Sequence, residues 1–310
     1  MKRIQYHRYG GPSEMRLEEF KLARPGAGQV AVRVKAASVN KVDWFVRNGG
    51  LKIVTRWRFP RAMGTDFAGV VEAVGSSVSR LKVGDEVFGT TPMRESGAFA
   101  EALVTNEKLA VVKPPALSFE IAACLPVVAV TAWRAITEIA HLRHGQTIFV
   151  NGCLGNVGRA AVQLAQKLGA SVAGSCRSST IAEARALGVD PVVDFTRFDG
   201  EAMKGRFDVV FDTPSLLSFK LARMLIKSDG VVIGTEPTPA TMLRSRFTRR
   251  YKLVIGTQTP EVLAKVAELT ATGHLQPKIG EVASLSEAIL AIADLELKGK
   301  PDGKLVIVTS

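Results

Sequence analysis

The sequence contains few of the residues that build metal sites and disulfide frameworks. Its 310 residues include only 3 cysteines and 4 histidines. The cysteines, Cys124, Cys153 and Cys176, show neither CxxC spacing nor histidine partners, which argues against a metal framework or a disulfide scaffold. We therefore expect reduced thiols and no bound metal. For Cys153 we expect the role of a small packing residue and not that of a nucleophile.

Long apolar runs are also missing. No stretch is long enough to span a bilayer, and the chain passes from Met1 into strand-like sequence without the apolar core of a signal peptide. We expect a cytoplasmic protein with no membrane partner. A hydrophobic content of 46% is ample for burial, and 310 residues exceed what one core usually supports, so two domains are expected.

Acidic residues are outnumbered, 29 against 41 Lys and Arg, for a formal charge of +12. Clustered cations can bind nucleic-acid phosphates. The densest basic run, residues 244–250, holds a single aromatic residue, Phe247, and no recognised RNA- or DNA-binding motif accompanies it. A solvated loop or a subunit contact is the better interpretation, and we do not expect nucleic acid as a partner.

Hydrophobic patterning divides the chain near residue 121. Before it, alternation at Val30, Val32 and Val34, the segment 69–75 and a turn at Gly84 indicate an irregular β domain. After it, short apolar segments alternate with helical patterns. These segments predict a six-stranded, doubly wound parallel sheet, an α/β fold with the ligand over the carboxyl ends of the strands. The expected strands are 147–150, 171–173, 192–193, 208–211, 231–234 and 253–256.

The segment NGCLGNVG, residues 151–158, joins the first of these strands to an amphipathic helix. Glycines at this junction allow a tight turn and close approach of a phosphate, and free main-chain N–H groups then bind the pyrophosphate of a dinucleotide. The alternative is a glycine-rich turn that binds nothing. The motif predicts that the cofactor is bound by Gly152, Gly155, Asn156, Val157 and Gly158, with Gly234 at the end of the fifth strand also in contact.

The end of the second strand decides which cofactor is preferred. No carboxylate occurs between Glu138 and Glu183, whereas Arg177 and Ser178 follow the strand directly. A cation there accepts the 2′-phosphate of NADP, and a charge-assisted hydrogen bond gives NADPH a preference of about ten- to a hundredfold. We expect NADPH as cofactor, with NADH as a weaker donor. The alternative is a surface arginine that binds nothing.

Several further segments carry a family resemblance over essentially the whole chain. They are AASVNKVDWFVRNG (36–49), MGTDFAGVVEAVG (63–75), LKVGDEVFG (81–89), GAFAEALV (97–104) and LPVVAVTAW (125–133), followed by the glycine loop. In them the sequence resembles the medium-chain dehydrogenase/reductase superfamily, in its zinc-independent quinone oxidoreductase and enone reductase branch. The resemblance implies a GroES-like catalytic domain, residues 1–121 completed by 275–310, and a Rossmann NADP-binding domain, residues 122–274.

The zinc enzymes of this superfamily need a cysteine near the position of Asn40 and a His-Glu pair where this chain has Thr65 and Asp66. Four cysteines for a structural zinc are also missing around residues 90–110. The resemblance therefore implies hydride transfer from NADPH, without zinc, to a quinone or to the C=C bond of an α,β-unsaturated carbonyl, in a homodimer. An enoyl-thioester reductase and a noncatalytic NADPH-binding protein that contacts RNA or a protein partner stay open as alternatives.

Two catalytic assignments follow from the resemblance. Asn40 matches a residue beside the nicotinamide that orients cofactor or substrate; its alternative is a turn residue after a strand. Thr131 matches a residue that approaches the nicotinamide and its ribose; its alternative is a helix-start hydroxyl.

The chain also departs from the family pattern. Relatives that use NADPH often carry Lys and Tyr where this chain has Thr180 and Phe195, and no tyrosine can be assigned as proton donor. We expect solvent or the ribose hydroxyl to supply the proton. We further expect Trp57, Phe59 and Phe99 to line an apolar acceptor pocket, or else to pack the β domain.

Overall fold

The computed structural model describes residues 1–55, 58–299 and 302–309, and they form two compact units. The first comprises Met1–Val127, Gln258–Thr272 and Pro277–Ser310, and the second Val128–Thr257 and Gly273–Gln276. Segments 122–127 and 258–272, which the sequence-based division assigns to the second domain, thus belong to the first unit. None of the described helices is both long and apolar enough to cross a membrane.

The first unit is β-rich. Within the described residues its strands form a three-stranded sheet, in the order β2-β1-β4, and a seven-stranded sheet, in the order β15-β16-β3-β5-β6-β8, with β7 also paired to β3. The strands are β1 (Lys2–Tyr6), β2 (Arg16–Glu19), β3 (Gln29–Ser38), β4 (Arg61–Ala62), β5 (Asp66–Val74), β6 (Glu86–Thr90), β7 (Ala102–Asn106), β8 (Ala110–Val112), β15 (Ile279–Ser284) and β16 (Lys304–Val308). The helices are α1 (Lys41–Arg47), α2 (Lys52–Thr55), α3 (Phe119–Ala123), α9 (Pro260–Ala271) and α10 (Ala288–Lys298), with 3-10 turns at Pro12–Glu14 and Glu107–Leu109.

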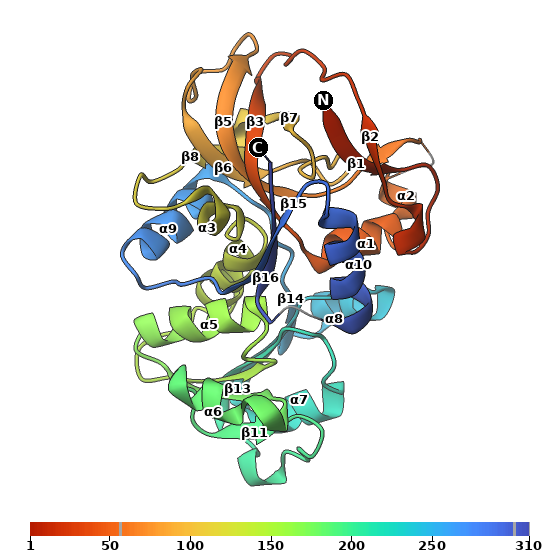
Figure 1. Ribbon diagram of the computed structural model, residues 1–310. Helices are drawn as coiled ribbons and strands as arrows, with labels where there is room; N and C mark the ends of the chain where they lie inside the picture. The colour runs from red at the N-terminus through yellow and green to blue at the C-terminus, as the bar shows by residue number, and fades with distance from the viewer. Residues whose placement is uncertain (56–57, 300–301, 310) are drawn as a thin grey trace. The chain divides into compact units, whose positions relative to one another are not determined.

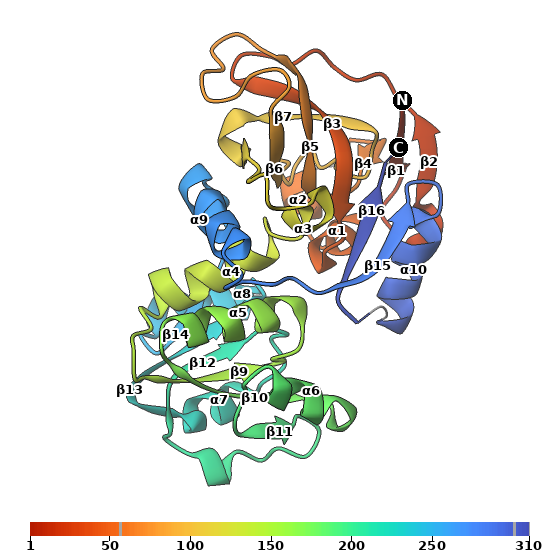
Figure 2. The ribbon, with the colours of Figure 1, turned by 60° about the vertical axis from the view of Figure 1, so that its left-hand side comes forward.

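The carboxyl-terminal strand belongs to this unit. β16 pairs antiparallel with β3, with Val306 opposite Ser38 and Val308 opposite Ala36, and Figure 2 shows the blue β15 and β16 beside the red β3. The return of the tail to the amino-terminal domain, which the family resemblance implies, is confirmed. It brings Lys304, at the start of β16, next to the end of β3.

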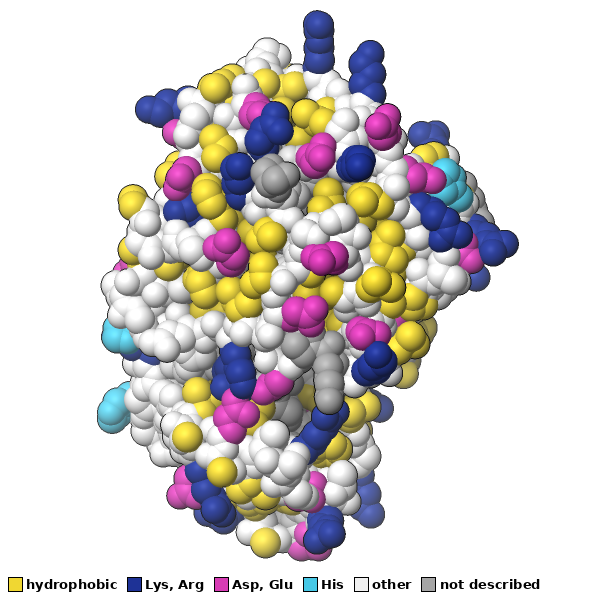
Figure 3. All heavy atoms as spheres, in the orientation of Figure 1, with side chains coloured by type: hydrophobic (Ala, Val, Ile, Leu, Met, Phe, Trp, Pro, Cys, Tyr) yellow, Lys and Arg dark blue, Asp and Glu magenta, His cyan; other side chains and the backbone are white. Residues whose placement is uncertain are grey.

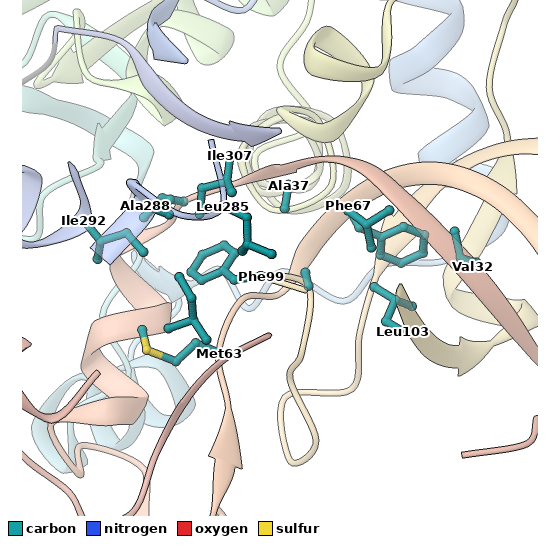
Figure 4. Close-up of a cluster of buried hydrophobic side chains, with 14 of the residues drawn as sticks. Val32, Ala37, Met63, Phe67, Phe99, Leu103, Leu285, Ala288, Ile292 and Ile307 are labelled. Atoms are coloured by element: carbon teal, nitrogen blue, oxygen red, sulfur yellow. The ribbon is translucent and has the colours of Figure 1, made fainter. Parts of the chain in front are cut away.

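The core of the first unit forms where β-strand alternation turns apolar side chains to one side. Val30, Val32 and Val34 are all fully buried on β3, because alternate residues of a strand share a face. Figure 4 shows Phe99 packed among Met63, Leu285 and Ile292, so residues from both ends of the chain fill one cluster.

The second unit contains a six-stranded parallel sheet in the order β11-β10-β9-β12-β13-β14, with α5, α6 and α7 around it in Figure 1. Its strands are β9 (Thr147–Asn151), β10 (Ser171–Cys176), β11 (Val192–Asp194), β12 (Phe207–Asp212), β13 (Ile226–Gly234) and β14 (Tyr251–Leu253). Its helices are α4 (Val128–Trp133), a π-helical segment Arg134–Ile139, α5 (Asn156–Lys167), α6 (Ile181–Ala186), α7 (Phe219–Leu225) and α8 (Pro239–Phe247), with 3-10 turns at Ser178–Thr180 and Glu201–Met203.

This sheet confirms the predicted fold class, although strand bounds differ locally. The fifth strand begins at Ile226 and not at residue 231. The last strand begins at Tyr251 and not at residue 253, because Tyr251 is buried and pairs in register with Val232. The basic run, expected as a solvated loop or a subunit contact, lies largely in helix α8, which Thr238 caps and Pro239 begins. The Arg244 guanidinium lies 4.1 Å from the centroid of the Phe219 ring.

Candidate functional site

The glycine loop lies between β9 and α5, as the sequence predicts. Gly152 has a φ of +72°, and a Cβ on Gly158 would lie 2.1 Å from the carbonyl oxygen of Gly152, so any larger residue at 158 would push the helix off the turn. Helix α5 begins at Asn156, with Gly155 as an N-cap that has no side chain to cap it. The first-turn N–H groups of a helix lack intrahelical acceptors and favour an anion. The loop and helix therefore fit a pyrophosphate.

A polar network fixes this turn to the sheet. The Ser175 hydroxyl donates to Asn151 Oδ1 at 2.5 Å, and the Asn151 amide donates to Asp212 Oδ1 at 2.7 Å. The Gly152 N–H in turn donates to the Ser175 hydroxyl oxygen at 3.2 Å. Asn151 and Asp212 end β9 and β12, and Ser175 lies one residue before the end of β10, so three strand ends are joined under the loop. Sequence reasoning missed this network, although a polar residue near the end of each apolar run was its signal.

The end of β10 carries the predicted cofactor-specificity residues. Arg177 is exposed and follows the strand directly. The Ser178 hydroxyl donates to the Asp194 carboxylate, which also accepts a hydrogen bond from the Thr196 N–H at 2.9 Å. The bond from Ser178 is the main cause that lowers the pKa of Asp194. Parallel pairing of Cys176 with Asp194 brings this carboxylate beside Ser178.

The sequence argument considered only the residues between 138 and 183, which hold no carboxylate. In the structure an acid comes from β11, the next strand of the sheet. The Asp194 carboxylate lies at Ser178, the residue that follows Arg177, so the surroundings of the predicted specificity residues include a negative charge.

Two other predicted cofactor residues of the second unit lie near the same edge. Gly234 ends β13, in register with Asp212, and Val157 lies in the first turn of α5. These two positions agree with one ligand site over the carboxyl ends of the strands. Thr131, predicted as a catalytic residue, is half-buried on α4, which packs against α5.

Asn40 lies in the first unit, in a buried polar cluster at the start of α1. Its Oδ1 accepts a hydrogen bond from Lys304 Nζ at 2.7 Å, and its amide nitrogen donates to Asp66 Oδ2 at 3.0 Å. Its main-chain N–H donates to Asp43 Oδ2 at 2.7 Å. The Asn40 amide is therefore held in one orientation by a cation on one side and a carboxylate on the other.

Burial controls ionisation in this cluster. Loss of solvation raises the pKa of Asp43 to about 7 and that of Asp66 to about 6, and it lowers the pKa of Lys304. Asp66 Oδ1 is buried and has no hydrogen-bond partner among the described residues. Sequence reasoning assigned a catalytic role here only to Asn40 and did not connect it with Lys304, which lies 264 residues away.

Of the predicted acceptor-pocket residues, Phe99 lies in the core and Phe59 packs against it. Phe99 is fully buried in the cluster of Figure 4, and the Phe59 ring packs 5.1 Å from that of Tyr9. Trp57 lies outside the described residues. The contacts of Phe59 and Phe99 are those of packing residues, and a role at an acceptor stays a prediction.

The described residues also bear on the predictions about metals, cysteines and nucleic acids. The described residues hold no group of three or more His, Cys, Asp or Glu side chains suited to a metal ion, and all three cysteines are buried and free. Burial raises the pKa of Cys153 to about 12, so its thiol is not activated as a nucleophile. On the face shown in Figure 3, Lys and Arg side chains are interspersed with acidic and apolar ones.

Comparison with known proteins identifies the families that this chain resembles. Residues 26–116 match the alcohol dehydrogenase GroES-like domain family, and residues 187–307 match the zinc-binding dehydrogenase family. The chain is 31% identical to the chloroplastic quinone-oxidoreductase QR1 of Triphysaria versicolor, over 99% of this chain and 98% of that protein. It is 32% identical to the chloroplastic NADPH-dependent alkenal/one oxidoreductase of Arabidopsis thaliana, over 90% and 72% of the two chains.

Among solved structures, the quinone oxidoreductase of Coxiella burnetii superposes with a TM-score of 0.91 at 27% identity, covering 100% of this chain and 99% of that one. A GroES-like domain with a parallel dinucleotide-binding sheet defines a nicotinamide-dependent dehydrogenase. The chain belongs to the medium-chain dehydrogenase/reductase superfamily, in its quinone oxidoreductase branch.

Proposed function

We propose that this oxidoreductase transfers a hydride from NADPH to a quinone or to the C=C bond of an α,β-unsaturated carbonyl, without zinc. The observation that carries the proposal is the Gly152–Gly158 turn at the amino terminus of α5, with Arg177 at the end of the neighbouring strand. The acceptor class is supported by what the relatives from Triphysaria and Arabidopsis are named for.

The loop amides would hold the pyrophosphate, and Arg177 would bind the 2′-phosphate. Asp194 reduces the advantage of that phosphate, because its carboxylate lies beside Ser178. We therefore propose a preference for NADPH that leaves NADH as a weaker donor.

The bound nicotinamide supplies the hydride, and the protein positions and desolvates the reacting groups. Asn40 is suited to positioning because Lys304 and Asp66 fix its amide. Thr131 would lie against the nicotinamide ribose. The proton that completes the reduction would come from solvent or from that ribose hydroxyl.

A metal-free reaction agrees with the residues at the family's catalytic zinc positions. Asn40, Thr65 and Asp66 offer neither thiolate nor imidazole, which zinc prefers. Elemental analysis of active protein tests this part, and one zinc per chain with loss of activity on chelation would contradict it.

The reaction is tested by following NADPH consumption with a panel of small quinones, enones, enals and enoyl thioesters. We expect turnover with quinones or enones and slower turnover with NADH. Turnover confined to enoyl thioesters would favour that alternative. Absence of turnover with every acceptor, together with salt-sensitive RNA binding, would favour the noncatalytic alternative.

We also propose a cytoplasmic homodimer. Strand β14 lies at an edge of the parallel sheet, and helix α8 exposes Leu243 and Phe247, which are 62% and 76% accessible. A second copy would cover this edge. Light scattering on the parent and on Phe247→Glu tests the assembly, and a parent that stays monomeric would contradict it.

A further inference from the structure

A cavity in the β-rich unit is surrounded by arginines. It has a volume of about 450 Å³, within the range of small-ligand sites. Arg3 on β1, Arg58, Arg61 on β4 and Arg94 line it, and Glu95 is the carboxylate among the described lining residues. Four guanidinium groups thus line a space that holds one carboxylate, and Glu18, opposite Arg3 on β2, also acts on Arg3. The excess of positive charge favours an anion in this space.

Arg61 is the most informative member of this pocket. It is only 7% exposed, and it donates to the Tyr6 hydroxyl at 3.2 Å and to the main-chain carbonyls of Thr55 and Arg94, each at 2.8 Å. All three acceptors are neutral. Within residues 1–55, 58–299 and 302–309, no carboxylate lies within salt-bridge distance of its guanidinium.

Two other buried cations of the same unit have a carboxylate partner. Arg47 is fully buried and forms an ion pair with Glu296 at 2.5 Å, and buried Lys113 pairs with Glu86 at 2.9 Å. A buried charge without a counterion costs several kcal/mol, on the order of 3–5. Arg61 is therefore placed where a ligand can supply the missing negative charge.

The pocket is also built to hold its cations in place. Through Thr55 and Arg94, Arg61 ties the end of α2 and one loop to β4, which fixes the main chain from which the Arg94 side chain extends. The Arg3 guanidinium lies 4.6 Å from the centroid of the Phe20 ring, and its Nε donates to Gln5 at 2.7 Å. Arg58 and Arg94 are exposed and form the solvent side of the pocket.

We infer that this pocket binds a small organic phosphate monoester. A phosphate monoester carries a charge of roughly −1.5 to −2 at pH 7, which suits four guanidinium groups better than one carboxylate does. Guanidinium groups bind phosphate oxygens with paired, directional hydrogen bonds. The remaining volume leaves room for an organic body beside the phosphate. The site is independent of the glycine loop, which belongs to the second unit.

Calorimetry without NADPH tests the proposal, with phenyl phosphate as the probe. We expect saturable binding to the parent protein and at least tenfold weaker binding to Arg58→Ala/Arg94→Ala. Glu95→Gln removes the opposing charge and is expected to bind more tightly. All three positions are exposed, so these variants should fold, and thermal unfolding followed by circular dichroism checks that they do.

Two matched variants separate this pocket from other anion sites. Arg24→Ala removes an exposed arginine of the same unit outside the pocket, and Arg177→Ala removes the proposed 2′-phosphate ligand. Neither should alter the binding of phenyl phosphate. Equal weakening by Arg24→Ala would show nonspecific charge attraction, and weakening by Arg177→Ala alone would place the probe at the dinucleotide site. Either result overturns the proposal, as does inorganic phosphate binding as tightly as phenyl phosphate.

Discussion

The two units of the molecule handle charge in different ways. The β-rich unit buries many ionisable side chains: Asp43, Arg47, Arg61, Asp66, Glu107, Lys113 and Lys304. In the parallel-sheet unit the buried acidic and basic residues among those described are Arg159 and Asp212, and its anion site is built from main-chain N–H groups. Amides do not titrate, so the second unit should bind a nucleotide with little pH dependence of its own. In the first unit, the free-energy cost of burying charged side chains depends on pH and on the partner of each charge.

A side chain at Gly158 should disrupt the main-chain anion site of the second unit. In Gly158→Ala the new methyl group would lie 2.1 Å from the Gly152 carbonyl, and the helix must shift away from the loop. We expect NADPH binding to weaken at least a hundredfold, by about 3 kcal/mol or more, with a clear loss of stability. Gly11→Ala, outside the loop, is the control and should keep the parent affinity, because its methyl group would meet nothing within 4 Å. Parent-like NADPH affinity of Gly158→Ala in calorimetry would refute the assignment.

Removal of the buried Lys304 cation should destabilise the polar cluster around Asn40 in the first unit. Lys304→Met leaves Asn40 Oδ1 without its donor and the two nearby aspartates without a counterion. Breaking a buried charged cluster in this way costs about 3–5 kcal/mol, and urea unfolding measures it. Lys298→Met, on the exposed end of α10, is expected to change stability by less than about 1 kcal/mol. Similar losses of unfolding free energy in both variants would contradict a stabilising role of Lys304 in the buried cluster.

This difference between the units also explains what the sequence could predict. The strand, loop and helix around Gly152–Gly158 were predicted correctly because their determinants are adjacent: an apolar run, glycines in order and an amphipathic helix. The six strands followed from local apolar runs for the same reason. Family motifs supplied the GroES-like domain and the return of the tail to β3.

Pairs between distant segments could not be predicted in the same way. Lys304 reaches Asn40 across 264 positions, and Asp194 reaches Ser178 only because β10 and β11 are neighbours. The arginine pocket collects its members from β1, β4 and two loops. Composition revealed the excess of basic residues but gave no indication of where they meet.

Ionisation of Asp43 in this buried cluster should make the stability of the first unit depend on pH. The pKa of Asp43 rises from 3.8 to about 7 on folding, so between pH 4 and 7 the folded protein retains a proton that the unfolded chain has lost. The contribution of Asp43 to stability therefore falls as pH rises through this window and is constant above it. Asp43→Asn removes this cost and keeps the amide oxygen that accepts from the Asn40 N–H.

We expect Asp43→Asn to gain stability relative to the parent as pH rises, by roughly 1.4 kcal/mol per pH unit inside the window. Denaturant unfolding of both proteins at pH 4, 5.5, 7 and 8 measures the difference. Asp229→Asn, at an exposed position, should show no such trend. A stability difference that does not change with pH would contradict burial as the cause.

The smallest expected effect concerns the exposed charges of the second unit. Because Arg177 and Asp194 act in opposite directions on a 2′-phosphate, two substitutions should move cofactor preference in opposite directions. Arg177→Ala should lower the ratio of kcat/KM for NADPH to that for NADH about ten- to a hundredfold. Asp194→Asn should raise the ratio by a few-fold, since a solvated charge has only a weak effect. Arg185→Ala, an exposed arginine on α6, should leave it unchanged. If both Arg177→Ala and Asp194→Asn leave the ratio unchanged, the end of β10 does not contact the cofactor's adenosine, and the specificity determinant lies elsewhere.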